Sequence, residues 1–196
     1  MTTASTTYTR TAIVLHWLIA AAVFAQISLG WWMLGIPKSP PGVRAYWFNV
    51  HKSIGITLGV LVLLRILWRL AHRPPALPAS MPRWQRVAAA WSHAGLYVCM
   101  LLMPLTGYLG SSFTKYPIKY WGHTLPHWGW DSPALKELMS QVHYTVVIVF
   151  MTLIAIHVAA AIKHLLTGGG VFQRMWAWPD RPGHELRGDA LPTGPR

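Results

Sequence analysis

Four histidines lie within stretches so apolar that they predict membrane-spanning helices: His16, His51, His143 and His157. An imidazole in hydrocarbon is costly unless something binds it, so an ionisable residue at that depth indicates a functional site. Histidines that project from helices into the core of a bundle commonly hold haem iron at its axial positions. These residues therefore favour redox chemistry at a buried haem, and the helices must bring the imidazoles together.

The composition predicts a small integral membrane protein. Of its 196 residues, 53% are hydrophobic and only 11% are charged, whereas about 25% are charged in an ordinary soluble domain. A membrane-spanning helix needs about 20 mainly apolar residues, and the chain offers such segments at about 11–33, 47–68, 87–111 and 138–166. We therefore expect an all-α fold, a four-helix transmembrane bundle within residues 1–178, followed by a polar C-terminal tail over 179–196.

The cysteine content limits the kind of cofactor. Cys99 is the only cysteine, which excludes an internal disulfide, a four-thiolate iron–sulfur cluster and a C-x-x-C-H site for covalent haem. Any haem is therefore expected to be b-type and held noncovalently. The formal net charge is +12, but basic residues beside membrane helices account for it, and the chain contains no nucleic-acid-binding module.

Lysine and arginine near the helix ends predict the orientation. The connection over 69–86 carries four arginines and no acid, and the segment after the fourth helix is also basic. We therefore expect both termini to be cytoplasmic, in the inner membrane of a bacterium. The connections expected on the outer side, at about 34–46 and 112–137, are basic as well. The basic residues in or next to them are Lys38, Arg44, Lys52, Lys115, Lys119 and Lys136. Such a surface could attract small anions, or its lysines could anchor helix ends beside lipid phosphates.

Helix geometry predicts that the four histidines work in pairs. His143 and His157 are 14 residues apart, which is about 21 Å along one helix and within about 40° of one face. His51 matches the depth of His143 near the outer side, and His16 matches His157 near the inner side. This matching predicts two bis-histidine haem sites. The alternatives are that these histidines only hydrogen-bond neighbouring helices, or that His93, at a depth similar to His16, replaces it.

Three further residues lie near the expected inner site. Arg65 and Arg69 are four residues apart on one helix face, and their guanidinium groups could grip haem propionates or a quinone. Contact with lipid phosphates is an equal alternative. His164 lies about 10 Å beyond His157 on nearly the same face, where it could hydrogen-bond a quinone or simply suit the helix C-terminus.

Gly55 and Gly59 leave room for a flat macrocycle or for close helix packing.

The chain resembles the bacterial cytochrome b561 family over residues 8–178, and especially its superoxide-oxidising members. The resemblance rests on Y-T-R-x(5)-H-W from Tyr8 to Trp17, H-x-x-x-G from His51, R-x-x-x-R from Arg65, H-x(10)-P-x-x-G from His93 and H-x(13)-H-x-A-A-A from His143. It implies a four-helix membrane bundle with two b haems. The axial ligands that it implies are His16, His51, His143 and His157.

The resemblance also implies a reaction, in which superoxide gives an electron at the outer face and ubiquinone is reduced. This leaves three hypotheses. The first is an oxidoreductase between superoxide and ubiquinone. The second is a noncatalytic cytochrome b that anchors a dehydrogenase or a soluble cytochrome, as a homodimer or with a redox partner protein. The third is a histidine-lined metal or proton transporter, which is disfavoured because the predicted helices lack the carboxylates common in transport paths.

Overall fold

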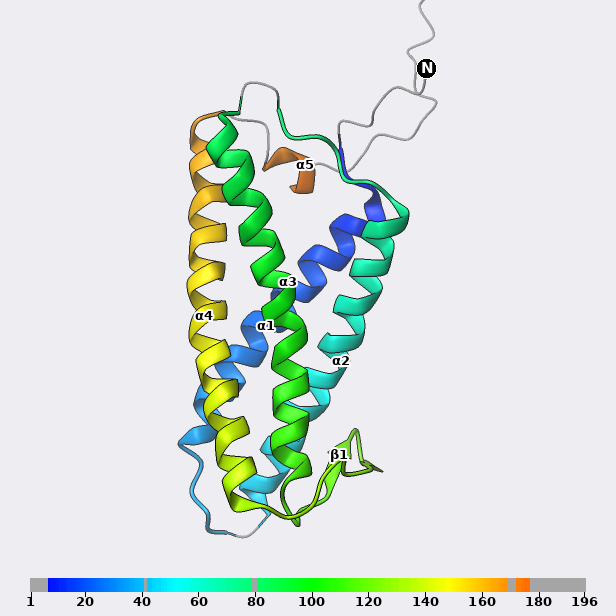
Figure 1. The fold of residues 1–196 in the computed structure, drawn as a ribbon, viewed down its shortest axis with the longest axis vertical. Coiled ribbons are helices and arrows are strands. Elements are labelled where there is room, and N and C mark those ends of the chain that lie inside the picture. Colours follow the sequence, from blue (N-terminus) through cyan, green and yellow to red (C-terminus); the bar gives the residue numbers. More distant parts are fainter. Residues whose placement is uncertain (1–6, 41, 79–80, 169–171, 177–196) are drawn as a thin grey trace, which may run out of the picture.

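The computed structural model describes residues 7–40, 42–78, 81–168 and 172–176, and four long helices make up most of it (Figure 1). They are α1 (Arg10–Leu34), α2 (Val43–Ala71), α3 (Arg83–Ser112) and α4 (Pro133–Leu166). Each is long and apolar enough to cross a membrane, so the predicted four-helix transmembrane bundle is confirmed. The tail predicted over 179–196 lies outside the described residues.

The helices begin earlier than the apolar segments indicate. α4 starts at Pro133 rather than near residue 138, because Ser132 caps it by accepting a hydrogen bond from the Leu135 amide at 3.4 Å. Proline is favourable in the first turn of a helix because its missing N–H is not needed there. α2 and α3 likewise start before residues 47 and 87, at Val43 and Arg83. Hydropathy identifies only the part of a helix that lies in hydrocarbon, whereas the hydrogen-bonded turns continue into the polar interface.

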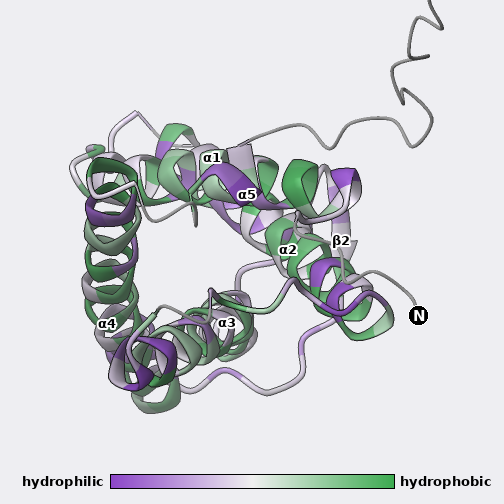
Figure 2. Cartoon of the chain, turned by 90° about the horizontal axis from the view of Figure 1, so that it is seen from above, coloured by the Kyte–Doolittle hydropathy of each residue, from purple (hydrophilic) through white to green (hydrophobic). Residues whose placement is uncertain are grey.

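The four helices alternate in direction, so each packs mainly on the next in the chain: α1 on α2, α2 on α3, and α3 on α4. α1 runs obliquely across the bundle, and the view along the long axis places the four helices around a common centre (Figures 1 and 2). We call one end of the bundle the termini end; it holds Arg10, Ala71, Arg83 and Leu166. The other is the hairpin end, with Leu34, Val43, Ser112 and Pro133.

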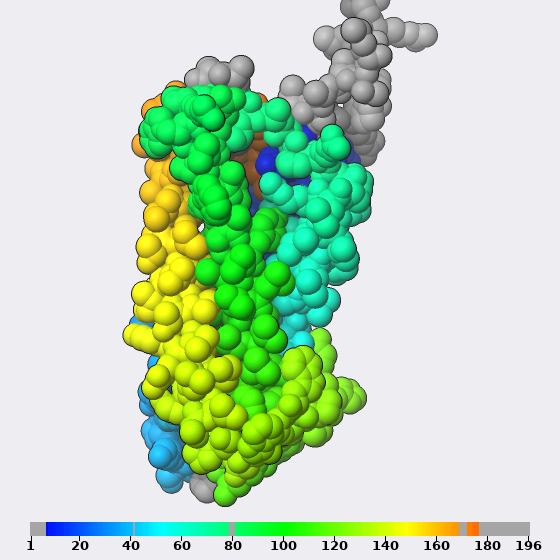
Figure 3. All heavy atoms as spheres, viewed as in Figure 1, coloured from blue at the N-terminus to red at the C-terminus, as the bar shows by residue number. Residues whose placement is uncertain are grey.

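The bundle has a thin core and an apolar exterior. Its buried centre consists of two clusters: Ile19, Leu58 and Val62, and Leu96, Cys99 and Phe150. Between 6% and 17% of the most apolar window of each helix is buried, and many large apolar side chains of the four helices are exposed. The space-filling view shows α2, α3 and α4 side by side along one face of the bundle (Figure 3). Helices that are apolar all round are stable in this arrangement when lipid surrounds them.

The connection between α3 and α4 folds into a short hairpin, β1 (Ile118–Tyr120) and β2 (His123–Leu125), which packs on α2. Trp121 and Gly122 form its two-residue turn with φ values of 45° and 93°, and a turn with two positive φ values matches the twist of paired strands. The Ser53 hydroxyl accepts from the Trp121 amide at 3.0 Å. The Trp121 indole donates to Thr57 Oγ1 at 3.3 Å, so this aromatic side chain is tied to α2.

At the termini end, a short helix returns to the bundle. This helix is α5 (Gln173–Trp176). The Trp17 indole of α1 donates to the Met175 carbonyl at 2.8 Å, and the Trp17 ring lies edge-on to Trp176 at 5.7 Å between centroids. Arg174 donates to the Ala76 carbonyl in the connection between α2 and α3. α5 therefore joins the end of the described chain to the first turns of α1, beside His16.

Candidate functional site

His51 of α2 projects toward α1, where a glycine and a glutamine receive it. A Cβ added to Gly30 would lie 3.2 Å from His51 Cε1, so only glycine gives the ring this position without displacement. One turn away on α1, Gln26 Nε2 donates to the backbone carbonyl of His51 at 2.7 Å. The His51 side chain is half-buried.

His143 of α4 meets α3 in a similar way. Its Nδ1 lies 2.9 Å from the hydroxyl of Thr106, which is 5% exposed. A Cβ added to the neighbouring Gly107 would lie 3.4 Å from His143 Cε1. The hairpin-end site, which we define as His51 and His143, is thus built by two histidines on α2 and α4 and by two glycines on α1 and α3.

Three histidines meet nearer the opposite end and define the termini-end site. The ring centroids of His16 and His157 are 6.2 Å apart, and those of His93 and His157 are 5.4 Å apart. α1, α3 and α4 each supply one imidazole. The structure therefore brings His16 and His157 together as their depths predicted, and it also brings His93 to His157.

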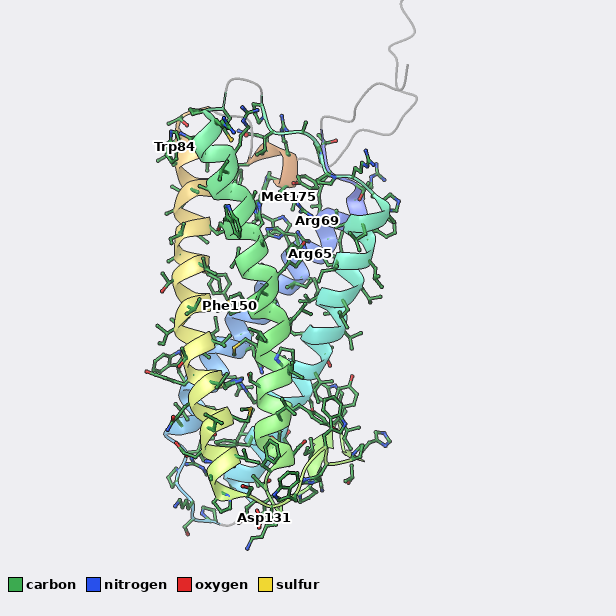
Figure 4. All side chains as sticks on the ribbon, viewed as in Figure 1. Arg65, Arg69, Trp84, Asp131, Phe150 and Met175 are labelled. Carbon is green, nitrogen blue, oxygen red and sulfur yellow. The ribbon has the colours of Figure 1, made fainter. Side chains whose placement is uncertain are left out.

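Arg65 links the termini-end site to two other helices. Its Nη1 donates to the Ala12 carbonyl at 2.9 Å, its Nε donates to the Tyr97 hydroxyl at 3.0 Å, and its Nη2 lies 3.3 Å from His16 Nδ1. A guanidinium group only donates, so His16 Nδ1 is the acceptor in the third contact. Arg69 lies one turn nearer the termini end, with its guanidinium carbon 5.9 Å from the Tyr97 ring centroid (Figure 4).

Three other positions singled out from the sequence, His164, Gly55 and Gly59, lie outside the two sites as defined above. His164 is half-buried at the end of α4, seven residues beyond His157. Gly59 lies against Pro104, whose Cγ would be 3.1 Å from an added Cβ, and Gly55 lies against the Gln26 amide at 3.3 Å. Both glycines thus serve close helix packing. Arg65, Arg69 and Tyr97 also line a small cavity of about 20 Å³ beside Ala12.

The pairing of imidazoles fits a haem better than a bare ion. Two imidazoles that bind one metal from opposite sides, each at a metal–nitrogen distance of ~2 Å, have ring centroids roughly 6 Å apart. His16 and His157 match this separation at 6.2 Å. Among the described residues, no three or more histidine, cysteine or acidic side chains are arranged to hold a metal ion. Paired neutral imidazoles on facing helices are the axial ligand set of b-type haems.

Sequence reasoning missed several residues of these sites. Gln26, Tyr97 and Thr106 contact the histidines or Arg65 directly, and Gly30 accommodates the His51 ring. A signal was present, because Gln26 and Thr106 are polar residues inside otherwise apolar segments. Which helix each one contacts depends on the tilt of α1 and the packing of α3 on α4, and the sequence alone does not contain that information.

Comparison with known proteins identifies the family. The profile described as prokaryotic cytochrome b561 matches residues 7–178. Cytochrome b561 homolog 2 of Escherichia coli K12 is 30% identical over 76% of this chain and 79% of its own length, and homolog 1 is 29% identical over 80% and 89%. The probable superoxide oxidase CybB of Yersinia pestis is 25% identical over 80% and 88%. The chain belongs to the prokaryotic cytochrome b561 family, and is thus a bacterial multi-pass membrane haem protein of electron transfer.

Proposed function

We propose that this protein oxidises superoxide at the outer face of the inner membrane and reduces ubiquinone, using two b-type haems. The observation that carries the proposal is that histidines of different helices lie at two depths in one bundle, with the rings of His16 and His157 6.2 Å apart at the termini end. His51 and His143 would hold one iron, and His16 and His157 the other. When bound, the haems would supply one-electron oxidation and reduction at the two ends of the bundle.

The reaction balances without a further reactant. Two superoxide anions each lose one electron and become dioxygen. One ubiquinone takes up the two electrons and two protons and becomes ubiquinol. The protein's task is to receive a small anion at one surface, to hold two redox centres in the membrane, and to admit a quinone.

The basic hairpin end supports an anionic substrate. Ser53 and the Lys119 carbonyl lie within 3.4 Å of each other, so the hairpin carries Lys119 to the turn of α2 that contains His51 and Lys52. Lys136 and Glu137 form an ion pair at 3.5 Å, and both side chains are exposed. The remaining excess of positive charge at this end would raise the local concentration of superoxide and speed its arrival.

Arg65 supports cofactor binding at the termini end. Ligation through His16 Nε2 requires the proton of the neutral ring to lie on Nδ1. Arg65 would then need another acceptor, and its planar fork matches a haem propionate carboxylate. Arg69 and His164 would serve the same propionates or the quinone. With the basic 69–86 connection at this end, we propose that both termini are cytoplasmic.

A second function has support of its own. The two relatives from Escherichia coli are more similar to this chain than the Yersinia pestis protein is, and their names state only cytochrome b561. The alternative is therefore an electron-transfer subunit without a substrate of its own, which docks a dehydrogenase, a soluble cytochrome or a second copy of itself. It shares the haem sites and differs only in the electron donor.

Optical spectroscopy of the detergent-purified protein distinguishes the two. The oxidised protein is exposed to a superoxide-generating system with and without ubiquinone, and superoxide dismutase serves as the control. Under the first proposal, sharp b-type α bands appear with superoxide, fade with ubiquinone and are abolished by the dismutase. Bands that respond only to dithionite would favour the electron-transfer subunit, and the absence of a Soret band would overturn both.

A further inference from the structure

Thr106 lies at the edge of the His143 ring, and its surroundings allow its hydroxyl only to accept a hydrogen bond from that ring. Its Oγ1 is 2.7 Å from the Leu102 carbonyl and 3.1 Å from the Met103 carbonyl, and 2.9 Å from His143 Nδ1. A carbonyl oxygen accepts and cannot donate. The single hydroxyl proton is therefore directed to the preceding turn of α3, as is usual for threonine in a helix. The lone pair that remains faces His143.

The direction of this bond defines the tautomer of His143. Because Thr106 Oγ1 accepts, Nδ1 of His143 must carry the proton, and the lone pair of the neutral ring lies on Nε2. Thr106 is 5% exposed, so water does not compete for the contact. Gly107, whose added Cβ would lie 3.4 Å from Cε1 and 3.6 Å from Nδ1, leaves room for the same edge of the ring.

The partner histidine of this site has a different environment. Nδ1 of His51 is buried and has no hydrogen-bond partner in the part of the chain that the structure describes. Gly30 would place a Cβ 3.2 Å from its Cε1 and 3.7 Å from its Nδ1, but no hydroxyl accompanies that glycine. The two imidazoles of the hairpin-end site are therefore unequal, and α3 supplies the difference.

We propose that Thr106 is a positioning residue that holds His143 as the Nδ1–H tautomer, with Nε2 presented to the haem iron, and that this bond strengthens His143 as a ligand. The inference rests on the proposed role of His143 as an axial ligand. An acceptor at Nδ1–H fixes the ring orientation and increases the basicity of the ligating nitrogen. More basic ligands favour the oxidised iron, so Thr106 keeps the reduction potential of this haem low.

The test compares three variants of the full-length haem protein. Thr106→Val keeps the branched shape and removes the hydroxyl, whereas Thr106→Ser keeps the hydroxyl. Thr152→Val is the matched control, because Thr152 is exposed on α4 and its hydroxyl likewise donates to a carbonyl one turn earlier, that of Ile148, at 2.9 Å. The readouts are the haem-to-protein ratio and a redox titration followed at the α bands.

We expect Thr106→Val to weaken binding of the hairpin-end haem by about 10- to 100-fold, the usual effect of losing such a partner. A tenfold loss confined to the oxidised form corresponds to an upward shift of ~59 mV in a one-electron potential. Thr106→Ser and Thr152→Val should both match the unmodified protein. A titration of Thr106→Val that superimposes on that of Thr152→Val would overturn the inference.

A chemical rescue gives an independent result if Thr106→Val does not assemble. In His143→Gly, added imidazole should restore the hairpin-end spectrum at lower concentration than 1-methylimidazole, which has no N–H to donate to Thr106. Equal affinity for both compounds would also overturn the inference. Failure of the proposed ligand role of His143 is distinguishable, because then His143→Ala would retain both haems. Failure of superoxide oxidation alone would leave the redox titrations unchanged.

Discussion

Replacing His157 with alanine should remove one haem and spare the other. His157 is the imidazole shared by both contacts of the termini-end site, at 6.2 Å from His16 and 5.4 Å from His93. Its loss opens that site whichever of the two is its partner. His143 lies 14 residues earlier on the same helix, about 21 Å away. Effects at sites separated by more than roughly 7–10 Å are usually independent.

The expected loss of haem follows from the distance of about 21 Å between His143 and His157. Phe150 lies midway between His143 and His157 and is 5% exposed, packed with Leu96 and Cys99. This buried cluster should keep the hairpin-end site intact. We expect the haem-to-protein ratio to fall by about half, because each pair of axial histidines holds one iron. One of two steps in the redox titration should disappear while the other keeps its potential.

The assay is a pyridine haemochrome determination on purified protein, with Thr152→Val, at an exposed position of α4, as the control on the same helix. Loss of both haems, or of neither, would refute the pairing of histidines by depth. His16→Ala and His93→Ala then identify the partner. We expect the first to reproduce the His157→Ala spectrum and the second to retain both haems, and the reverse result would assign the iron to His93.

Three other perturbations test the rest of the molecule. Arg65→Met should lower the free energy of unfolding by about 1 kcal/mol, from the hydrogen bonds to Tyr97 and Ala12 at roughly 0.6 kcal/mol each in a membrane bundle. Denaturation in detergent measures this, and an unchanged midpoint would contradict it. Gly30→Val should displace His51 and remove the hairpin-end haem bands, whereas Gly35→Val, whose Cβ lies at an ordinary 3.5 Å from its nearest neighbour, should keep them. The rate of haem reduction by superoxide should fall as ionic strength rises, because salt screens the attraction of the anion to the outer lysines. A rate that does not change with salt would favour the alternative, in which these lysines anchor helix ends beside lipid phosphates.

The fold was predictable because a membrane imposes strong constraints on composition. Apolar segments long enough to span it gave the number of helices and their order, and a bundle of helices is one of the few ways to satisfy backbone groups in lipid. Helix ends were less predictable. Ser132 caps α4 six residues before the apolar segment begins, and capping depends on a local hydrogen bond that hydropathy does not detect.

The candidate site was predictable to the level of depth along a helix. Counting residues put His16 at the depth of His157, and the structure brings their rings to 6.2 Å; that they ligate iron stays a prediction. Counting did not separate His93 from His16, because depth says nothing about rotation around the bundle. The role of Thr106 was also out of reach, since it depends on the packing of α3 against α4 within a few tenths of an ångström.

The placement of His143 and His157 on the same helix has a consequence for biogenesis. α4 is the last of the four long helices to leave the ribosome, and both sites borrow an imidazole from it. Neither site can be complete while only α1, α2 and α3 are in the membrane. With the haem ligands that we propose, cofactor loading at both depths would wait for insertion of α4, and a chain that carries only α1, α2 and α3 would not hold haem with both ligands.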